Sequence, residues 1–287
     1  MTSQDTPATP DPGVYPGVSF DDYWKWDAAN QSLLSRFARS AAHAREYQLH
    51  PPKRTPALDK GQATHTAILE GPDAFAATYL RAPDLARNTK KGREAWAAAE
   101  GANPTKILLP AGDFDAVLRM VRAIPEGSRA WDLLHGEKGA NEVSLLWLDE
   151  RTGLACKARL DRLTTFEAWP TVVDLKTTRN AADWAFSRSA HDYGMHIQAA
   201  HTLAGLRALG DEGASRRFFN VAVENEPPHA FVPYELDEEA LDQGEREVRC
   251  YLRALAKCRE TGEWPGYPDQ VTSLSLPPYT LDAEALQ

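Results

Sequence analysis

The sequence predicts an α/β protein in which a mainly helical first half precedes a core of strands and helices. The chain has 287 residues, 43% of them hydrophobic, which is enough to bury a sizeable core in one catalytic unit. Helical spacing of apolar residues dominates up to about residue 138. From there on, short apolar runs bounded by turn residues are typical of strands.

The first half contains the expected helices. Residues 1–17 hold four prolines among small polar residues, so we expect a disordered leader outside the fold. Apolar spacing predicts a helical region over 20–47, ended by the turn HPPKRTP. A second helix, over about 60–69, should end at Gly71 and Pro72. Further helices are expected at about 73–80, 91–101, 111–123 and 129–135.

The second half alternates strands and helices. Three strand-like runs, EVSLLWLD (142–149), LACKARLDRLTT (154–165) and TVVDLKTT (171–178), predict a meander. A helical stretch over 181–209, broken near Tyr193 and Gly194, leads to two strand candidates, RRFFNVAVEN and HAFVPYEL, and an amphipathic helix over 238–261. We therefore expect a single domain over 18–287, with a mainly helical part at 18–138 and an α/β core at 139–287.

Charge and cysteine usage exclude several classes of protein. A net charge of -9 argues against a protein that coats nucleic acid, although local basic patches remain compatible with a DNA enzyme. The three cysteines form no CxxC pair, so neither a disulfide framework nor a zinc ribbon is indicated. The chain shows no signal peptide and no apolar run of membrane-spanning length. We expect a cytoplasmic protein that does not bind membranes.

The sharpest local motif is Asp161, twelve intervening residues, and then Asp174-Leu175-Lys176. Alternation along the strand places Asp174 and Lys176 on one face and points Leu175 into the core. Paired carboxylates hold Mg²⁺, and an adjacent ammonium can orient a water or balance charge on a phosphate, so the motif favours phosphodiester hydrolysis. The alternative is a pair of exposed surface residues. The apolar neighbours Val172 and Val173 argue against it, because an unpaired Asp in a core strand is costly.

Four motifs in order extend this reading to a family. ACKARLDRL, VVDLKTT, YGMHIQAA and the upstream GQATHTAILEGPDAF resemble RecE-type exonucleases (exonuclease VIII) of the PD-(D/E)XK superfamily, over about 35–276. The resemblance implies a three-layer core with a central mixed sheet flanked by helices, plus a helical N-terminal extension. It also implies metal-dependent 5′ to 3′ digestion of linear double-stranded DNA, leaving 3′ single strands for recombination. A homo-oligomeric ring, a single-strand annealing protein as partner, and a phage or prophage origin belong to the same expectation.

Site roles follow from the resemblance position by position. It implies that Asp161, Asp174 and the Leu175 carbonyl are metal ligands, that Lys176 is the catalytic lysine, and that His65 is a further ligand. Because imidazole is not a natural ligand of Mg²⁺, we expect Mn²⁺ to substitute for it.

The helical stretch over 181–209 and the first strand supply further candidates. Gln198 would bond the attacking water or the scissile phosphate, and Tyr193 would contact DNA or, as we favour, pack. Glu142 is a candidate for supporting the ligands or holding a second metal. The family's proline before the first acidic residue is Leu160 here, and an aromatic expected after the glutamine is replaced by His201 or Thr202. Neither departure removes a ligand.

Basic residues predict where DNA binds. The segment 81–96 concentrates cations and forms the best electrostatic footprint, with a tryptophan, Trp96, that we expect in the core rather than stacked on a base. A second-rank pair follows the lysine motif, and Lys53-Arg54 ranks third. The predicted DNA-binding residues are Arg81, Arg87, Lys90, Lys91, Arg93, Arg179 and Arg188.

Two alternatives remain open at this point. The first is an endonuclease or single-strand nuclease of the same superfamily. The second is a catalytically inactive DNA-binding or recombination accessory protein with the same fold. The intact set of Asp161, Asp174 and Lys176 argues against the second, because the loss of one of them would be the usual sign of an inactive site.

Overall fold

The computed structural model describes residues 9–51, 55–210 and 217–274. Its central feature is a six-stranded sheet in the order β1-β4-β5-β6-β7-β8. Neighbouring strands are antiparallel except for the parallel pair β6–β7. The strands are β1 (Gly13–Pro16), β4 (Gly139–Leu148), β5 (Ala155–Phe166), β6 (Trp169–Thr178), β7 (Arg217–Glu224) and β8 (Phe231–Glu235). The predicted α/β class with a mixed central sheet is confirmed.

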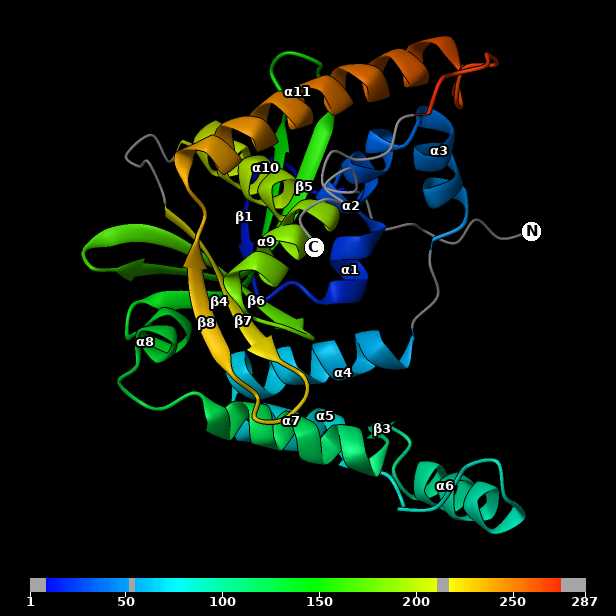
Figure 1. The fold of residues 1–287 in the computed structure, drawn as a ribbon, viewed down its shortest axis with the longest axis vertical. Coiled ribbons are helices and arrows are strands. Elements are labelled where there is room, and N and C mark those ends of the chain that lie inside the picture. The colour runs from blue at the N-terminus through cyan, green and yellow to red at the C-terminus, as the bar shows by residue number, and fades with distance from the viewer. Residues whose placement is uncertain (1–8, 52–54, 211–216, 275–287) are drawn as a thin grey trace, which may run out of the picture.

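Helices cover both faces of the sheet (Figure 1). One face carries α10 (Met195–Ala208), crossed by α11 (Glu238–Thr261), and packs a core that includes Leu145, Val172 and Phe218. The other face carries α4 (Pro56–His65), α7 (Ala111–Ala123) and α8 (Arg129–His135), over a core that includes Val173 and Val221. Successive side chains of β6 point to opposite faces of the sheet, so this strand contributes residues to both cores.

Smaller elements complete the layers. They are α1 (Phe20–Lys25), α2 (Gln31–Leu34), the 3₁₀ turn Ser35–Ala38, α3 (Ala41–Leu49), the π-helical turn Thr66–Glu70, α5 (Pro72–Thr78) and α9 (Asp183–Asp192). The single helical region expected over 20–47 is thus wrong in detail. Asn30 and Ser40 each accept a backbone N–H at the start of a new helix and so divide the region. The expected break near Gly194 is confirmed, because this glycine adopts a left-handed conformation (φ 66°) between α9 and α10.

The N-terminal segment belongs to the fold. Gly13–Pro16 forms β1 and pairs with β4 from Val143 to Leu146. The expectation of a disordered leader over 1–17 is therefore wrong for these residues, and residues 1–8 lie outside the described part of the chain. Pro16 does not prevent pairing, because an edge strand leaves one row of backbone groups free and tolerates a residue that cannot donate.

A buried lysine fastens α1 beneath this edge. The Lys157 ammonium, on β5, donates to the carbonyls of Tyr23, Trp24 and Trp26 at 3.0, 3.2 and 2.7 Å. Burial lowers the pKa of Lys157 to about 8, since water is replaced by only these three acceptors. The segment before residue 30 is therefore held by specific polar contacts as well as by apolar packing.

An arm extends from the body on the α4 side (Figure 1). It consists of α6 (Lys90–Ala102) and a parallel two-stranded sheet of β2 (Tyr79–Arg81) and β3 (Ile107–Leu109). These two strands were not predicted, because three residues are too few to show a period. Trp96 is buried within the arm and donates to the Leu85 carbonyl at 3.2 Å, so its expected place in a core is confirmed.

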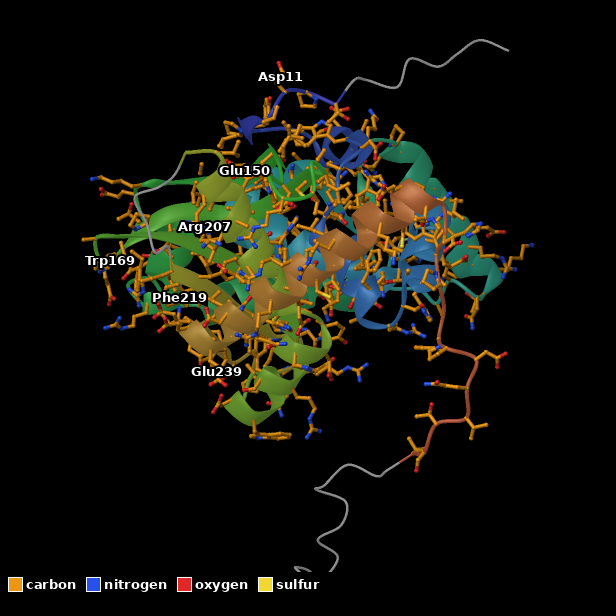
Figure 2. All side chains as sticks on the ribbon, turned by 90° about the horizontal axis from the view of Figure 1, so that it is seen from above. Asp11, Glu150, Trp169, Arg207, Phe219 and Glu239 are labelled. Carbon is orange, nitrogen blue, oxygen red and sulfur yellow. The ribbon has the colours of Figure 1, made fainter. Side chains whose placement is uncertain are left out.

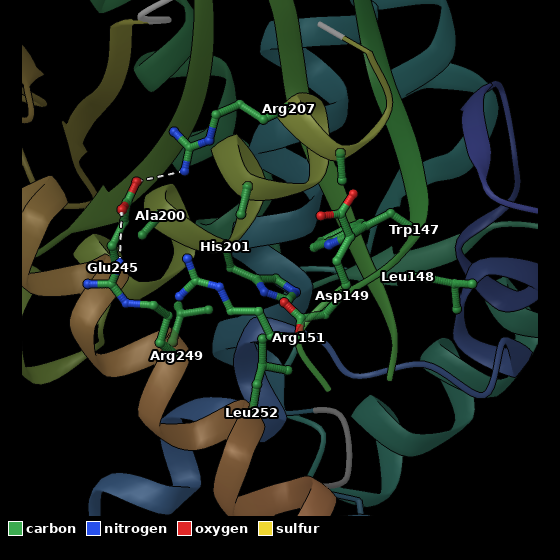
Figure 3. Close-up of a pocket in the computed structure, with 14 residues that line it drawn as sticks. Trp147, Leu148, Asp149, Arg151, Ala200, His201, Arg207, Glu245, Arg249 and Leu252 are labelled. Atoms are coloured by element: carbon green, nitrogen blue, oxygen red, sulfur yellow. Dashed lines mark hydrogen bonds and ion pairs between the residues drawn. The ribbon is translucent and has the colours of Figure 1, made fainter. Parts of the chain in front are cut away.

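A cleft of about 330 Å³ opens between the β4–β5 turn, α10 and α11 (Figure 3). It is lined by Trp147, Arg207 and Glu245 among others, and by none of the predicted site residues. Charged residues of its lining pair with one another, since Arg207 donates to Glu245 at 2.6 Å. The cleft is separate from the carboxylate motif and carries no functional assignment.

His201, beside this cleft, makes the stability of the protein depend on pH. It is 1% exposed, and burial lowers its pKa to about 4. The unfolded chain binds the proton near pH 6.5 and the folded chain only near pH 4. The free energy of unfolding should therefore fall as pH drops from about 6.5 to 4, by roughly 3 kcal/mol from this group. Urea denaturation at pH 7, 5.5 and 4 measures it.

The control is His201→Gln, whose amide keeps a donor for the Lys157 carbonyl that His201 faces at 3.2 Å. Between pH 7 and 4 this variant should lose about 3 kcal/mol less stability than the wild type. Equal losses in the two proteins would contradict the assignment to His201.

Candidate active site

The site forms where the ladder between β5 and β6 ends. Their backbone pairing runs from Phe166–Trp169 to Arg162–Val173 and stops before Asp161 and Asp174. The Asp161 carboxylate takes up part of the lost pairing, because its Oδ2 accepts the Leu175 N–H at 2.7 Å. Leu175 itself is fully buried on the opposite face, as the alternation predicted. The two strands thus open at the point where both carboxylates emerge.

One part of the site is a carboxylate, lysine and amide triangle. The Lys176 ammonium lies 2.6 Å from Asp174 Oδ2 and donates to Gln198 Oε1 at 3.1 Å. Gln198 Nε2 in turn donates to Asp174 Oδ1 at 2.6 Å. Gln198 lies in the first turn of α10. The packing of α10 against the sheet therefore brings the third member to the triangle. The structure brings these three predicted residues together.

The other part is a group of possible metal ligands. One ligand atom each from His65, Glu142 and Asp161 lies within 4.8 Å of the others. His65 Nδ1 is 3.4 Å from Asp161 Oδ2. Asp174 is not in this group, because its carboxylate is turned to Lys176 and Gln198. Glu142, ranked low on sequence grounds, joins Asp161 and His65 in this group, and the role of Asp174 as a metal ligand stays a prediction.

Sheet register explains why Glu142 reaches the site. Its neighbours Asn141 and Val143 pair with Arg162 and Leu160, which sets Glu142 opposite Asp161 on β5. Facing residues of antiparallel strands project from the same side of the sheet. Glu142 has a positive φ of 53°, an uncommon conformation for this residue type that frees it from the regular ladder.

Arg159 holds Glu142 in place and is a residue that the sequence did not single out. Its Nε donates to Glu142 Oε2 at 2.7 Å, and its Nη1 donates to the Val18 carbonyl at 2.7 Å and to Ser144 Oγ at 3.0 Å. Only the pairing of β4 with β5 sets Arg159 opposite Ser144 and near Glu142, so its role could have been inferred from the strand register alone. Arg159 thereby balances part of the negative charge without occupying a ligand position.

His65 is placed by an irregular helix. It ends α4, and the next five residues form a π-helical turn from Thr66 to Glu70. A π turn adds one residue to a helical turn and occurs often at functional sites. Here the Leu69 carbonyl at its end accepts from the Asn141 amide at 2.6 Å, so the same turn connects α4 to β4 beside Glu142.

The electrostatics of the site indicate a place for a cation. Burial raises the pKa of Asp174, and the Asp161 charge adds to this although Lys176 opposes it. Burial and Asp161 likewise raise the pKa of Glu142. Asp161 is the exception, since the charge and hydrogen bond of His65 outweigh burial and lower its pKa. Three carboxylates therefore compete for few cations, which is the environment that a divalent ion relieves.

His65 and Lys176 respond to the same excess of negative charge. Burial is the largest single influence on His65 and lowers its pKa, but the charge and hydrogen bond of Asp161, together with the Asp174 charge, outweigh it and raise the pKa. For Lys176 the charges of Asp174 and Asp161 also outweigh burial and raise the pKa. Lys176 is thus an ammonium at neutral pH, whereas His65 must lose its proton before it can bind a metal.

Most cations of the predicted basic footprint on the arm have partners within the protein, and their predicted contact with DNA stays a prediction. Arg81 makes a double hydrogen bond with Asp115 at 2.9 and 2.8 Å, and Arg87 binds Glu100 at 2.8 Å. Arg93 donates to the Asn88 carbonyl, and Lys90 lies 4.0 Å from Glu94. Of the five cations predicted there, Lys91 alone has no partner among the described residues. Sequence could not show this, because Arg81 and Asp115 are distant in the chain.

The two arginines that follow the lysine motif, and Tyr193, are exposed to solvent. Arg179 and Arg188 are exposed and make no hydrogen bond or ion pair with any described residue. Tyr193 is 75% exposed, so the favoured expectation that it packs is wrong, and no described contact joins its ring to the ligands. Lys53 and Arg54 lie outside the described residues.

One protein family and one solved structure agree with this architecture. A family described as "PDDEXK-like domain of unknown function (DUF3799)" matches residues 30–277. A solved structure from Eubacterium rectale, titled "putative exonuclease", aligns with a TM-score of 0.59 at 14% identity, over 93% of this chain and 98% of that chain. The structure of SSO0001 aligns over 79% of this chain and 75% of that one, at 12% identity and a TM-score of 0.32. No curated protein matches the sequence.

Proposed function

The chain belongs to the PDDEXK-like domain family matched above, and from this premise we propose that it is a divalent-metal-dependent nuclease that digests linear double-stranded DNA from its ends. The observation that carries the proposal is the pairing of two groups at one opening of the sheet. His65, Glu142 and Asp161 form a ligand group, and Lys176 is held beside it by Asp174 and Gln198.

The residues fit a hard divalent cation. Two carboxylates and an imidazole suit Mn²⁺ well and accept Mg²⁺ with water filling the remaining positions. The Leu175 carbonyl was expected as a further ligand and stays a prediction. A bound Mg²⁺ or Mn²⁺ supplies charge to the phosphate and lowers the pKa of a coordinated water.

The protein's own groups perform the rest of the work. Asp161, Glu142 and His65 fix the ion, with Arg159 orienting Glu142. Asp174 and Gln198 restrict the Lys176 side chain so that its ammonium faces the opening. There it can orient the attacking water and offset the negative charge that builds up on the phosphate.

Direction and biological role come from the resemblance to RecE-type exonucleases. It supports 5′ to 3′ digestion that leaves 3′ single strands for recombination, a ring-shaped homo-oligomer, a single-strand annealing partner and a phage or prophage origin. All of these stay proposals. In the described part of the chain, no helix is both long and apolar enough to cross a membrane.

Digestion of end-labelled linear duplex with Mg²⁺, Mn²⁺ or EDTA tests the proposal. We expect cleavage with both metals, none with EDTA, and early release of label from the 5′ end only. Closed-circular duplex should resist. Equal cleavage of circular and linear DNA would indicate an endonuclease, preference for single strands would indicate a single-strand nuclease, and binding without cleavage would indicate the inactive accessory protein.

A further inference from the structure

Helix α9 belongs to the chain segment that connects two residues of the site. It lies in the segment between Lys176 and Gln198, and the 3.1 Å hydrogen bond between these two side chains closes that segment into a loop. Ten helical residues span about 15 Å, and the contact of Phe186 with Tyr234 seats α9 against β8, two strands from β6. The solvent-facing side chains of α9 are therefore within reach of a DNA strand that extends beyond the reacting phosphate.

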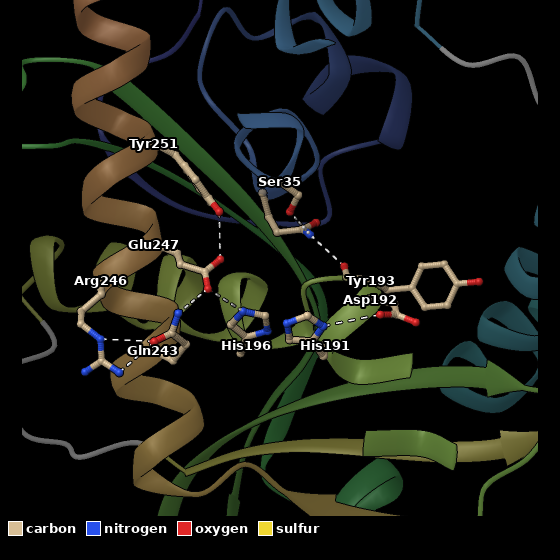
Figure 4. A network of polar contacts seen from close by, with 10 residues as sticks. Ser35, His191, Asp192, Tyr193, His196, Gln243, Arg246, Glu247 and Tyr251 are labelled. Carbon is tan, nitrogen blue, oxygen red and sulfur yellow. Dashed lines mark hydrogen bonds and ion pairs between the residues drawn. The ribbon is translucent and has the colours of Figure 1, made fainter. Parts of the chain in front are cut away.

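Its inner face is firmly packed. Phe186 stacks on Tyr234 of β8 with ring centroids 5.0 Å apart, and the Tyr234 hydroxyl donates to the Ala181 carbonyl at 2.6 Å. Beyond the end of α9, His196 lies 3.4 Å from Glu247 of α11, and Tyr193 projects away from this network (Figure 4). The helix is thus a fixed platform rather than a loose connection.

Two aromatic rings that face solvent lie on α9 and directly after its last residue. Trp184 is 71% exposed and Tyr193 is 75% exposed, more than any other aromatic side chain in the described chain. Large rings are normally buried for their apolar area, so two such rings beside one site indicate a ligand with flat apolar faces.

Unpaired cations accompany the rings. Arg188 follows Trp184 by one helical turn and shares its face, and Arg179 precedes the helix. Neither arginine has a partner among the described residues, whereas the α9 carboxylates do: Asp183 accepts from Ser187, and Asp192 lies 3.5 Å from His191. Free guanidinium groups bind phosphates, and exposed rings stack on unpaired bases, whose faces a duplex conceals.

We propose that the outer face of α9, with Tyr193, binds a single-stranded segment of the substrate next to the site. This inference rests on the proposed nuclease function and specifies which form of DNA contacts the enzyme there. It assigns base stacking to Trp184 and Tyr193 and phosphate binding to Arg188 and Arg179.

Anisotropy of labelled (dT)₂₀ and of a blunt duplex, measured in EDTA to prevent cleavage, tests the surface. The double variant Trp184→Ala/Tyr193→Ala should bind (dT)₂₀ at least about tenfold more weakly and the blunt duplex nearly unchanged. Arg188→Ala should reduce the salt dependence of (dT)₂₀ binding by about 0.7 in log–log slope.

Matched controls exist on the same chain. Trp169 is 54% exposed at the far end of the β5–β6 hairpin (Figure 2), and Arg253 is exposed on α11, so Trp169→Ala and Arg253→Ala should bind (dT)₂₀ as the wild type does. Wild-type affinity in the double variant, or an equal loss for the duplex, overturns the inference. Digestion of linear duplex by the wild type is scored separately, so failure of the nuclease proposal is distinguishable.

A second, independent observation concerns Asn220 on β7. It is 1% exposed, and neither its amide oxygen nor its amide nitrogen has a hydrogen-bond partner among the described residues. It pairs with Asp174 in the parallel register of β6 and β7, so both side chains project from the same face of the sheet. A buried amide without partners destabilises a fold, and an apolar residue of the same size would avoid that cost.

The geometry points to Asn220 as a positioning residue for Asp174. In the free protein, Asp174 has Lys176 at 2.6 Å. When a phosphate draws the Lys176 ammonium toward itself, Asp174 loses this partner in a buried place, and the neighbouring Asn220 amide supplies an N–H in its stead. The amide therefore keeps the carboxylate fixed during turnover.

Asn220→Leu separates this role from a structural one. We expect its melting temperature to equal or exceed that of the wild type, while kcat falls at least tenfold and KM changes little. Asn220→Ser, which keeps a small donor, should recover part of kcat. Unchanged kcat in Asn220→Leu, or a loss of kcat together with a lower melting temperature, overturns the inference.

Discussion

Replacing Lys176 with alanine is expected to reduce cleavage of linear duplex DNA by a factor of about 10²–10³ or more. The ammonium is the positive group that the structure holds beside the ligand group, 2.6 Å from Asp174 and 3.1 Å from Gln198. Alanine leaves the metal ligands in place but removes the charge that balances the reacting phosphate. Single-turnover rates with saturating enzyme measure this effect on the chemical step.

The fold of the Lys176→Ala variant must be checked, because its partner Asp174 is buried. Without the ammonium, Asp174 keeps the Gln198 amide and the proposed Asn220 amide, neither of which carries a charge, so its pKa, already raised by burial, should rise further and the carboxyl should take up a proton. Far-UV circular dichroism and binding of Mn²⁺ should resemble the wild type. Lys257→Ala, on the exposed side of α11, is the control and should cut normally. Wild-type rates in Lys176→Ala would contradict the proposed mechanism.

Gly244→Ala is expected to lower the free energy of unfolding by about 3 kcal/mol, at the upper end of the usual cost of overpacking. A Cβ at Gly244 would lie 2.2 Å from the His196 carbonyl oxygen and 2.9 Å from Ala200 Cβ. The contacts are mainly with the backbone of α10, which cannot give way as a flexible side chain would. Because α10 also carries Gln198, cleavage should fall as well as stability.

Gly101→Ala is the matched control for this substitution. Gly101 lies on α6, where an added Cβ would meet nothing within 4 Å. Alanine there should stabilise the protein by about 0.5–1 kcal/mol through its higher helix propensity. Urea denaturation of both variants at pH 7 measures the two effects. Gly244→Ala with wild-type stability would show that α11 can shift away from α10 without loss.

Strands β4 to β8 and the central motif were predictable because their signals are local. Alternation along TVVDLKTT placed Asp174 and Lys176 on one face, and the structure agrees. His65 and Gln198 could be joined to them only by resemblance, since no periodicity links residues of different elements. Glu142 was underestimated because its place opposite Asp161 depends on strand register, which the sequence of one strand does not specify.

Pairing between distant residues was the main limit. The cluster of cations at 81–93 looked free in sequence, but Asp115 and Glu100 neutralise two of them from other elements. Exposure was equally hidden: Tyr193 was expected to pack and instead faces solvent. The β1 strand was missed because its four residues acquire order only from β4, a partner more than a hundred residues later.

The parallel pairing of β6 with β7 has a consequence for how the protein folds. Antiparallel neighbours such as β4 and β5 can form early from adjacent segments, whereas β6 and β7 meet only after α9 and α10 have crossed between them. His65 must also arrive from a segment far from Asp161 in the chain. The ligand group is thus complete only when α4 has brought His65 to the β4–β5 pair, and a divalent ion bound to all three residues favours the complete fold over partly folded forms.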